Sequence, residues 1–210
     1  MSLKKLTVYV IIGLSYNFIF GLVGTIYPQI FKPLALAVTI KSIHFLVTLA
    51  FMFFFYNFSM DYARDVTLKT VSFSVFAGFM FSAFLEFFEI AFMLSRRPDV
   101  YRIRIISEFV SWIVLLLLLI FFIVFLREEK KYELKLTGAI VSGICGISIF
   151  FIVKTVAIAN YLIIKKTGFT LMSGFYMKIP FVILMPLLIV AYALYIYFYV
   201  AFYKSLAKNT

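Results

Sequence analysis

This 210-residue sequence is poor in charge and holds a single cysteine and a single histidine. Charged residues make up 14% of the chain, whereas an average soluble domain has about 25%. The lone Cys145 excludes an internal disulfide and a metal site built from cysteines alone. The lone His44 excludes a bis-histidine haem. No stretch of about 50 residues is free of long apolar runs, so a separate soluble catalytic or DNA-binding domain has no room.

Catalytic patterns are also missing. The sequence has no Gly-x-Ser-x-Gly elbow, and the predicted helix that holds Cys145 offers no base to activate a thiol. Glu86 and Glu89 are not flanked by the histidines that an intramembrane metalloprotease needs. We therefore expect no enzymatic activity and no metal site, and the residues indicate no particular cofactor.

Long apolar runs are what the sequence does have, with 65% hydrophobic residues. Six runs approach or exceed the roughly 20 residues that cross a bilayer, and they lie near 7–30, 33–57, 67–94, 105–126, 137–164 and 180–203. The first is too long for the apolar region of a signal peptide. The sequence thus predicts one all-α domain over 1–210, a polytopic integral membrane protein with about six transmembrane helices in the cell membrane. The net charge of +11 lies mostly at the ends of the runs, which favours lipid headgroups over nucleic acid as its partner.

The connections between the runs are short, so neighbouring helices should be antiparallel and both termini should share one side of the membrane. Ten Lys and Arg residues fall on that side, at 4, 5, 64, 69, 127, 130, 131, 135, 204 and 208. Eight fall on the side of the first, third and fifth loops, at 32, 96, 97, 102, 104, 165, 166 and 178. The positive-inside rule then predicts cytoplasmic termini, although five of the six loop acids also lie on the terminal side.

Apart from Lys69 at the edge of the 67–94 run, six ionisable residues lie within the predicted spans, where each costs several kcal/mol unless it faces a bundle interior or a water-filled cavity. They are Lys41, His44, Glu86, Glu89, Glu108 and Lys154. Counted from the ends that meet the first, third and fifth loops, all six fall within about 17 Å of one membrane face, at roughly 1.5 Å per residue. The other half of the bundle has none. This asymmetry predicts that any ligand or ion site lies in the half near those loops.

Two helices carry small residues at four-residue steps, a spacing that lets helix backbones approach closely in lipid. The first series is Thr70, Ser74, Gly78 and Ser82, which ends at Glu86. The second is Gly138, Ser142 and Gly146, which leads to Lys154 after an interruption at Phe150. Because both helices run in the same direction, we expect Glu86 and Lys154 to lie at one depth. A buried ion pair between them is the resulting hypothesis.

The charges of this group do not cancel, because two lysines face three glutamates. Either His44 or a glutamate must then be protonated, or a cation must bind. This imbalance favours a ligand, ion or proton site. Two structural interpretations stay open: buried charges can fix which helices pack together, and Glu108 can form an interfacial pair with Arg104 four residues before it.

Residues 44 to about 120 resemble the MASE-type membrane-associated sensor domains. The likeness rests on the helix that runs from His44 through Phe55, on Leu85-Glu86-Phe87-Phe88-Glu89 and on Arg104-Ile105-Ile106-Ser107-Glu108. Glu89 stands where that family tends to have histidine. The resemblance implies that His44, Glu86, Arg104 and Glu108 are the counterparts of the polar sites of the family.

The leading functional expectation is a non-enzymatic sensor or ligand-binding bundle that signals through helix movement to a partner protein or to another copy of itself. A small transporter or substrate-binding membrane subunit is the alternative, in which Glu86, Glu89 and His44 would carry protons or cations and Lys154 would be the counter-charge. A structural subunit of a larger membrane complex is a third. If the protein is a sensor or a transporter, it would also bind a small ligand or cation.

Overall fold

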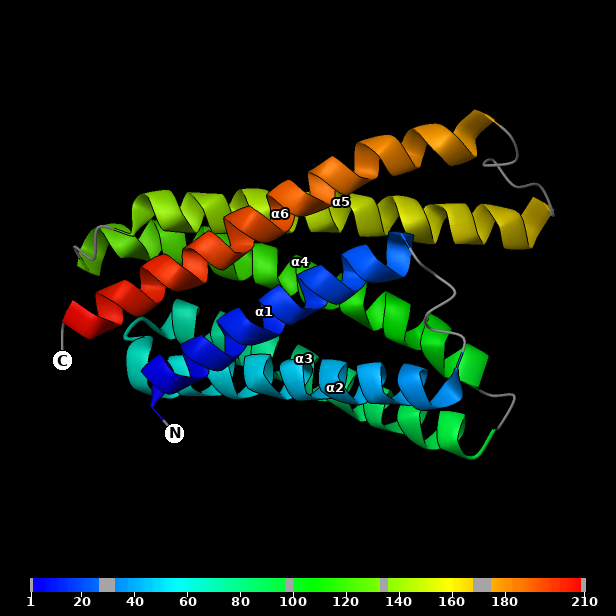
Figure 1. The fold of residues 1–210 in the computed structure, drawn as a ribbon. Coiled ribbons are helices and arrows are strands. Elements are labelled where there is room, and N and C mark those ends of the chain that lie inside the picture. The colour runs from blue at the N-terminus through cyan, green and yellow to red at the C-terminus, as the bar shows by residue number, and fades with distance from the viewer. Residues whose placement is uncertain (1, 27–32, 97–99, 133–135, 168–174, 209–210) are drawn as a thin grey trace.

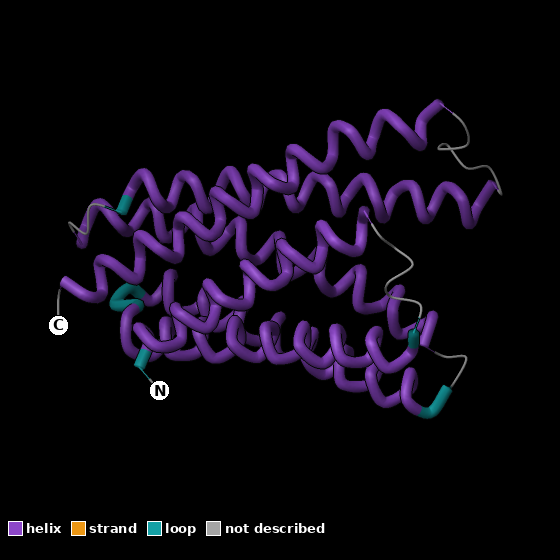
Figure 2. Tube along the Cα trace, viewed as in Figure 1, coloured by secondary structure: helices purple, strands orange, loops and turns teal. Residues whose placement is uncertain are grey.

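The computed structural model describes residues 2–26, 33–96, 100–132, 136–167 and 175–208, and these are helical apart from short connections. The long helices are α1 (Leu3–Ile26), α2 (Leu34–Asn57), α3 (Val66–Leu94), α4 (Val100–Tyr132), α5 (Thr137–Thr167) and α6 (Phe175–Lys208). A π-helical turn, η2 (Phe58–Tyr62), extends α2. Figure 2 shows how little of the chain lies outside helices.

All six long helices contain a stretch long and apolar enough to cross a membrane. This confirms the predicted all-α, six-span membrane bundle. In Figure 1 successive helices alternate in direction, and both termini lie at one end of the bundle. We call the half next to the termini the terminal half, and the half in which α1, α3 and α5 finish the loop half.

Several helices are longer than the apolar runs that predict them. The run over 105–126 becomes the 33-residue α4, which takes in Arg102 and Arg104 at its start and Glu128 and Glu129 near its end. Helical hydrogen bonding does not stop where the hydrocarbon stops, and charged residues at helix ends reach the headgroup region. The helix ends therefore extend beyond the apolar segment that the sequence marks.

Two helix starts follow from local chemistry. Pro33 directly precedes α2 with φ −64°, the angle its ring imposes, at a position where no backbone N–H is needed. Asp65 is the N-cap of α3, and its carboxylate accepts hydrogen bonds from the backbone N–H groups of Thr67 (2.8 Å) and Leu68 (3.4 Å). Those groups have no partner within the helix, so the cap makes the turn from η2 into α3 compatible with burial.

The six helices form a closed ring. Each packs against the next along the chain, and α1 also packs against α6. In this order α4 lies between α3 and α5. The two helices with small residues at four-residue steps are therefore not neighbours in the ring, although the hypothesis of a Glu86–Lys154 pair required them to be close.

Aromatic side chains fill the inside of the ring in the terminal half. Phe58 is fully buried, and its ring centroid lies 5.2 Å from that of Phe121, 5.4 Å from Phe125 and 5.8 Å from Phe202. These rings come from α4, α6 and η2. The contacts of Phe58 with Phe121 and Phe125 are edge to face, a geometry that adds to the packing energy. Because lipid tails are as apolar as these rings, tight packing rather than the hydrophobic effect must hold the helices together.

Small residues of the two series lie at two separate helix contacts of the bundle. A Cβ on Gly146 of α5 would lie 2.8 Å from the carbonyl oxygen of Ala191 in α6, and the Ser142 hydroxyl donates to the carbonyl of Leu194 at 3.2 Å. On α3, a Cβ on Gly78 would lie 3.0 Å from the Val114 side chain of α4.

The other members of the two series make no such approach. A Cβ on Gly138 would meet nothing within 4 Å. Ser74 donates to the carbonyl of Thr70 within its own helix, and Ser82 faces a cavity. The close approach at four-residue steps thus brings α5 to α6 and α3 to α4.

Candidate functional site

In the loop half the ring encloses a cavity of about 540 Å³. All six helices contribute to its wall. Among the lining residues are Leu14 and Phe18 of α1, His44, Thr48 and Phe51 of α2, Phe79, Ser82 and Glu86 of α3, Glu108, Ser111 and Leu118 of α4, Ile147, Phe150 and Lys154 of α5, and Leu188, Tyr192 and Tyr195 of α6. The volume lies within the range of pockets that hold small organic molecules.

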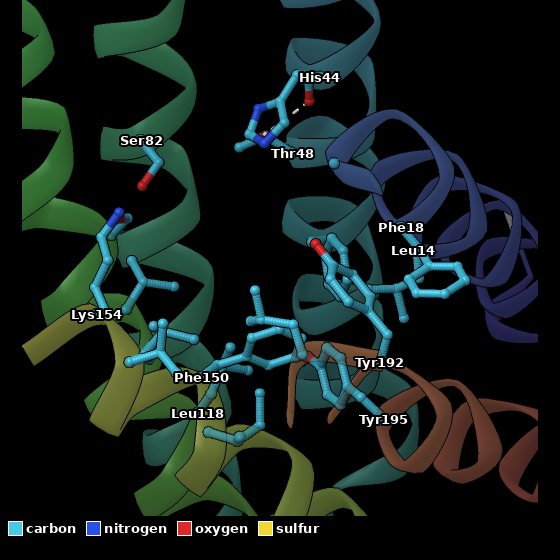
Figure 3. Close-up of a pocket in the computed structure, with 18 of the residues that line it drawn as sticks. Leu14, Phe18, His44, Thr48, Ser82, Leu118, Phe150, Lys154, Tyr192 and Tyr195 are labelled. Atoms are coloured by element: carbon cyan, nitrogen blue, oxygen red, sulfur yellow. Dashed lines mark hydrogen bonds between the residues drawn. The ribbon is translucent and has the colours of Figure 1, made fainter. Parts of the chain in front are cut away.

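The floor of the cavity is apolar and aromatic. Tyr195 is buried, and its ring lies 6.3 Å from that of Phe51, which in turn stacks on Phe79 at 5.1 Å. Phe150 meets Tyr192 edge to face at 4.8 Å. Figure 3 shows Phe150, Leu118, Tyr192 and Tyr195 gathered on one side of the cavity and His44 and Ser82 on the other. A ligand would therefore meet rings at one end and polar groups at the other.

Two tyrosines of the last span, Tyr192 and Tyr195, line this floor. Tyr199 lies one turn deeper and is fully buried in the aromatic core. Its hydroxyl is 3.2 Å from that of Tyr195, so the two phenols satisfy one another where water is absent.

The polar side begins with a histidine–carboxylate pair between α2 and α3, which is an ion pair only when the imidazole is protonated. His44 Nδ1 lies 2.9 Å from Glu86 Oε1. Glu86 is 4% exposed, whereas 46% of the His44 side chain is exposed. The second oxygen of Glu86, Oε2, is buried and has no hydrogen-bond partner among the described residues.

His44 also borders a smaller cavity of about 360 Å³, which shares Tyr192 and Gly21 with the first and is otherwise lined by Tyr16, Asn17, Phe20 and Ile40. This second space lies toward the contact of α1 with α2. The imidazole thus stands between two adjoining spaces, and a ligand that contacts His44 can extend into either one.

A second ion pair joins α4 to α5. The Lys154 ammonium donates to Glu108 Oε2, and both residues line the cavity. Beside this pair the indole N–H of Trp112 donates to the Thr155 hydroxyl at 2.9 Å. The two contacts are side by side on consecutive turns, so they hold α4 and α5 together at the level of the cavity.

A third pair again links α2 to α3. The Lys41 ammonium lies 2.8 Å from Glu89 Oε2, and the Glu89 side chain is 7% exposed. Neither residue lines the 540 Å³ cavity. The pair lies one turn beyond His44 and Glu86, toward the loop end, and strengthens the same helix contact.

These pairs revise the charge arrangement that the sequence suggests. The predicted Glu86–Lys154 ion pair is wrong: Glu86 pairs with His44, and Lys154 with Glu108. All three glutamates have a basic partner on a neighbouring helix. The group is neutral if His44 is protonated and carries one negative charge if it is not.

Arg104 lies apart from this group. It is exposed on the first turns of α4, and no ion pair of its side chain is found among the described residues. Glu108, four residues later, turns instead to Lys154, so the interfacial Arg104–Glu108 pair considered from the sequence is not the contact that the structure contains.

Two buried acids at the opposite end of the bundle were not predicted. Glu128 and Glu129 are 6% and 3% exposed. The Glu129 carboxylate accepts from the backbone N–H of Leu136 at 2.7 Å and from the Thr137 hydroxyl at 2.6 Å, so it caps the start of α5. A signal existed, because both acids continue the buried face of α4 three and four residues after Phe125.

Comparison with models of protein families, with curated proteins and with solved structures finds no match for this chain.

Proposed function

We propose that this protein is a membrane-embedded sensor that binds a small amphipathic molecule inside its helix ring and passes occupancy to a partner protein by helix movement. The observation that carries the proposal is the 540 Å³ cavity to which all six helices contribute. A cavity with rings on one side and a few polar groups on the other is the usual form of a small-molecule site.

The distribution of packing supports a signalling role. Helices are fixed in the terminal half by buried rings such as Phe54, Phe58 and Phe202, while in the loop half the α4–α5 and α2–α3 contacts depend on ion pairs. A ligand that competes for Glu86, Glu108 or Lys154 would change these contacts directly. Binding energy that differs between two helix arrangements is what shifts their populations.

The first test asks whether the cavity holds a molecule. Protein is purified gently from its membrane, and the small molecules it retains are extracted and identified by mass spectrometry. We expect the wild type to retain a compound that Ser82→Phe, which fills the cavity, has lost. Ser74→Phe is the matched control, since it adds the same ring eight residues earlier on α3, outside the cavity. The same extract from all three proteins would contradict the proposal.

The second test asks whether occupancy moves helices. In a Cys145→Ser background, spin labels are placed at Ile19 and Val156, which are exposed in the loop half of α1 and α5. A control pair at Tyr9 and Val141 is exposed in the terminal half of the same helices. We expect the retained compound, added back to stripped protein, to change the first distance in pulsed electron paramagnetic resonance and to leave the second unchanged. Two unchanged distances would remove the sensor part of the proposal.

A small transporter is the second candidate, favoured by the His44–Glu86 pair at the cavity wall. A histidine and a carboxylate in contact can take up and release a proton within a membrane. In sealed vesicles a transporter would show proton-coupled solute flux that Glu86→Gln abolishes. Such flux would replace the sensor assignment.

A further inference from the structure

We propose that the molecule bound in the cavity is a monovalent organic cation, a protonated amine on an apolar or aromatic body, and that Glu86 is its counter-charge. This proposal rests on the proposed function and names the chemical class of the ligand. It starts from one atom. Among the described residues that line the cavity, Glu86 Oε2 is the single buried side-chain polar atom without a hydrogen-bond partner.

An ionised carboxylate only accepts hydrogen bonds, so this oxygen calls for a donor. Leaving such a charged group buried without one is costly, and the cost is greater in a membrane interior. The partner on the other oxygen, His44, satisfies Oε1 at 2.9 Å and leaves Oε2 open. Glu86 itself lines the cavity, so a donor for this oxygen can come from a bound ligand.

The charges around the cavity favour a cation over an anion. The ammonium of Lys154 is already bound to Glu108, and that of Lys41 faces Glu89. With a neutral imidazole, the four ionisable residues that line the cavity, His44, Glu86, Glu108 and Lys154, sum to one negative charge. A monocation that binds beside Glu86 neutralises the group and fills the open acceptor with an N–H donor, a charge-assisted hydrogen bond.

The remaining residues of the cavity wall indicate what kind of molecular body carries the ammonium group. Below the polar side the cavity is bounded by Phe51, Phe79, Phe150 and Tyr192, aromatic side chains that pack against the apolar body of a ligand. Ca²⁺ takes six to eight oxygen ligands and Mg²⁺ six, and one open carboxylate oxygen above an aromatic floor supplies far fewer. An organic ammonium group with an apolar body fits both ends of the space.

The test uses three probes that share one body and differ in their head group: 4-phenylbutylamine, 4-phenylbutanol and 4-phenylbutyrate. Binding of radiolabelled probe to the protein in nanodiscs of zwitterionic lipid is measured at neutral pH. Nanodiscs that carry Ser82→Phe give the background from partition into lipid. We expect the amine to bind at least tenfold more tightly than the alcohol, and the carboxylate to bind least.

Variants assign this preference to Glu86. Glu86→Gln should remove the advantage of the amine over the alcohol, whereas Glu86→Asp, which keeps the charge, should retain it. Glu89→Gln is the matched control, since Glu89 is equally buried on the same helix but lies outside the cavity, and it should keep the full preference. Thermal unfolding of each variant identifies any that has lost its fold, and Glu86→Asp then decides the result.

Each result that contradicts the proposal has a different consequence. Alcohol or carboxylate that binds as tightly as the amine, in a manner that Ser82→Phe abolishes, would overturn the cationic class and leave the cavity as a ligand site. An amine preference that survives in Glu86→Gln would overturn the role of Glu86. If no probe binds, the cationic proposal falls, while the compound retained on purification still decides the proposed function.

Discussion

The contact of α5 with α6 allows a sharp test of the helix ring. Gly146 has no side chain at the point where the two backbones come closest. A Cβ there would lie 2.8 Å from the carbonyl oxygen of Ala191 and 3.2 Å from the backbone nitrogen of Tyr195. Because both are backbone atoms, no change of rotamer relieves the overlap. In Gly146→Ala the helices must separate by a few tenths of an ångström, which also lengthens the 3.2 Å hydrogen bond from Ser142 to Leu194.

Two contributions of opposite sign determine how far Gly146→Ala changes the free energy of unfolding. Overpacking of a close contact costs about 1–3 kcal/mol, and replacing a helical glycine by alanine returns up to about 1 kcal/mol. We expect Gly146→Ala to lower the free energy of unfolding by about 1–2 kcal/mol. Gly138→Ala, on the same helix and with nothing within 4 Å of the new Cβ, keeps only the favourable term and should be neutral or more stable by up to about 1 kcal/mol.

Reversible unfolding in mixed micelles with increasing dodecyl sulfate measures both variants, followed by circular dichroism and by the emission of Trp112, the single tryptophan. The informative quantity is the difference between the two variants, because any general effect of adding a methyl group to α5 cancels. Equal stability of Gly146→Ala and Gly138→Ala would refute the close approach of α5 to α6 and the packing order of the ring that depends on it.

Three further predictions use the same assay. In a double-mutant cycle, Lys41→Met and Glu89→Gln should each destabilise the bundle, and the pair should be coupled by about 1–3 kcal/mol; additive effects would argue against their 2.8 Å ion pair. Phe58→Ala should cost about 3 kcal/mol because the ring is fully buried among others, whereas Phe87→Ala, 57% exposed toward lipid, should cost under about 0.5 kcal/mol; similar costs would contradict the aromatic core. Asp65→Ala should lower the unfolding free energy by about 1 kcal/mol through loss of the α3 cap, and Asp65→Asn should recover most of it if the cap is the cause.

The number of helices, their directions and the depth of the ionisable residues in the loop half could be predicted from the sequence, because each depends on a one-dimensional pattern. Apolar runs long enough to span a bilayer specify the helices. The depth of Lys41, His44 and Glu86 follows from counting residues along each run at a fixed rise per residue. Depth is enough to place the ionisable residues in the loop half, which is where the cavity lies.

Pairing could not be predicted in this way, because it depends on the rotation of each helix and on the order of helices around the ring. Small residues at four-residue steps show that a backbone can approach closely, but they do not show what approaches. Gly78 turns out to face α4 and Gly146 to face α6. Glu86 and Lys154 are therefore at a shared depth without being partners, and each takes the base or acid on the helix beside it.

The aromatic side chains that fill the terminal half also determine whether ions can pass through the bundle. Phe54, Phe58, Phe121, Phe125 and Phe202 are fully buried there, and a hydrated ion would have to shed its water to pass between them, at a prohibitive Born energy. The layer of aromatic rings therefore separates the cavity from the face of the bundle that bears the termini. A cation bound at Glu86, as proposed above, would have to cross this layer to leave by the terminal half. The bundle would then bind and release that cation without a leak of current through the aromatic layer.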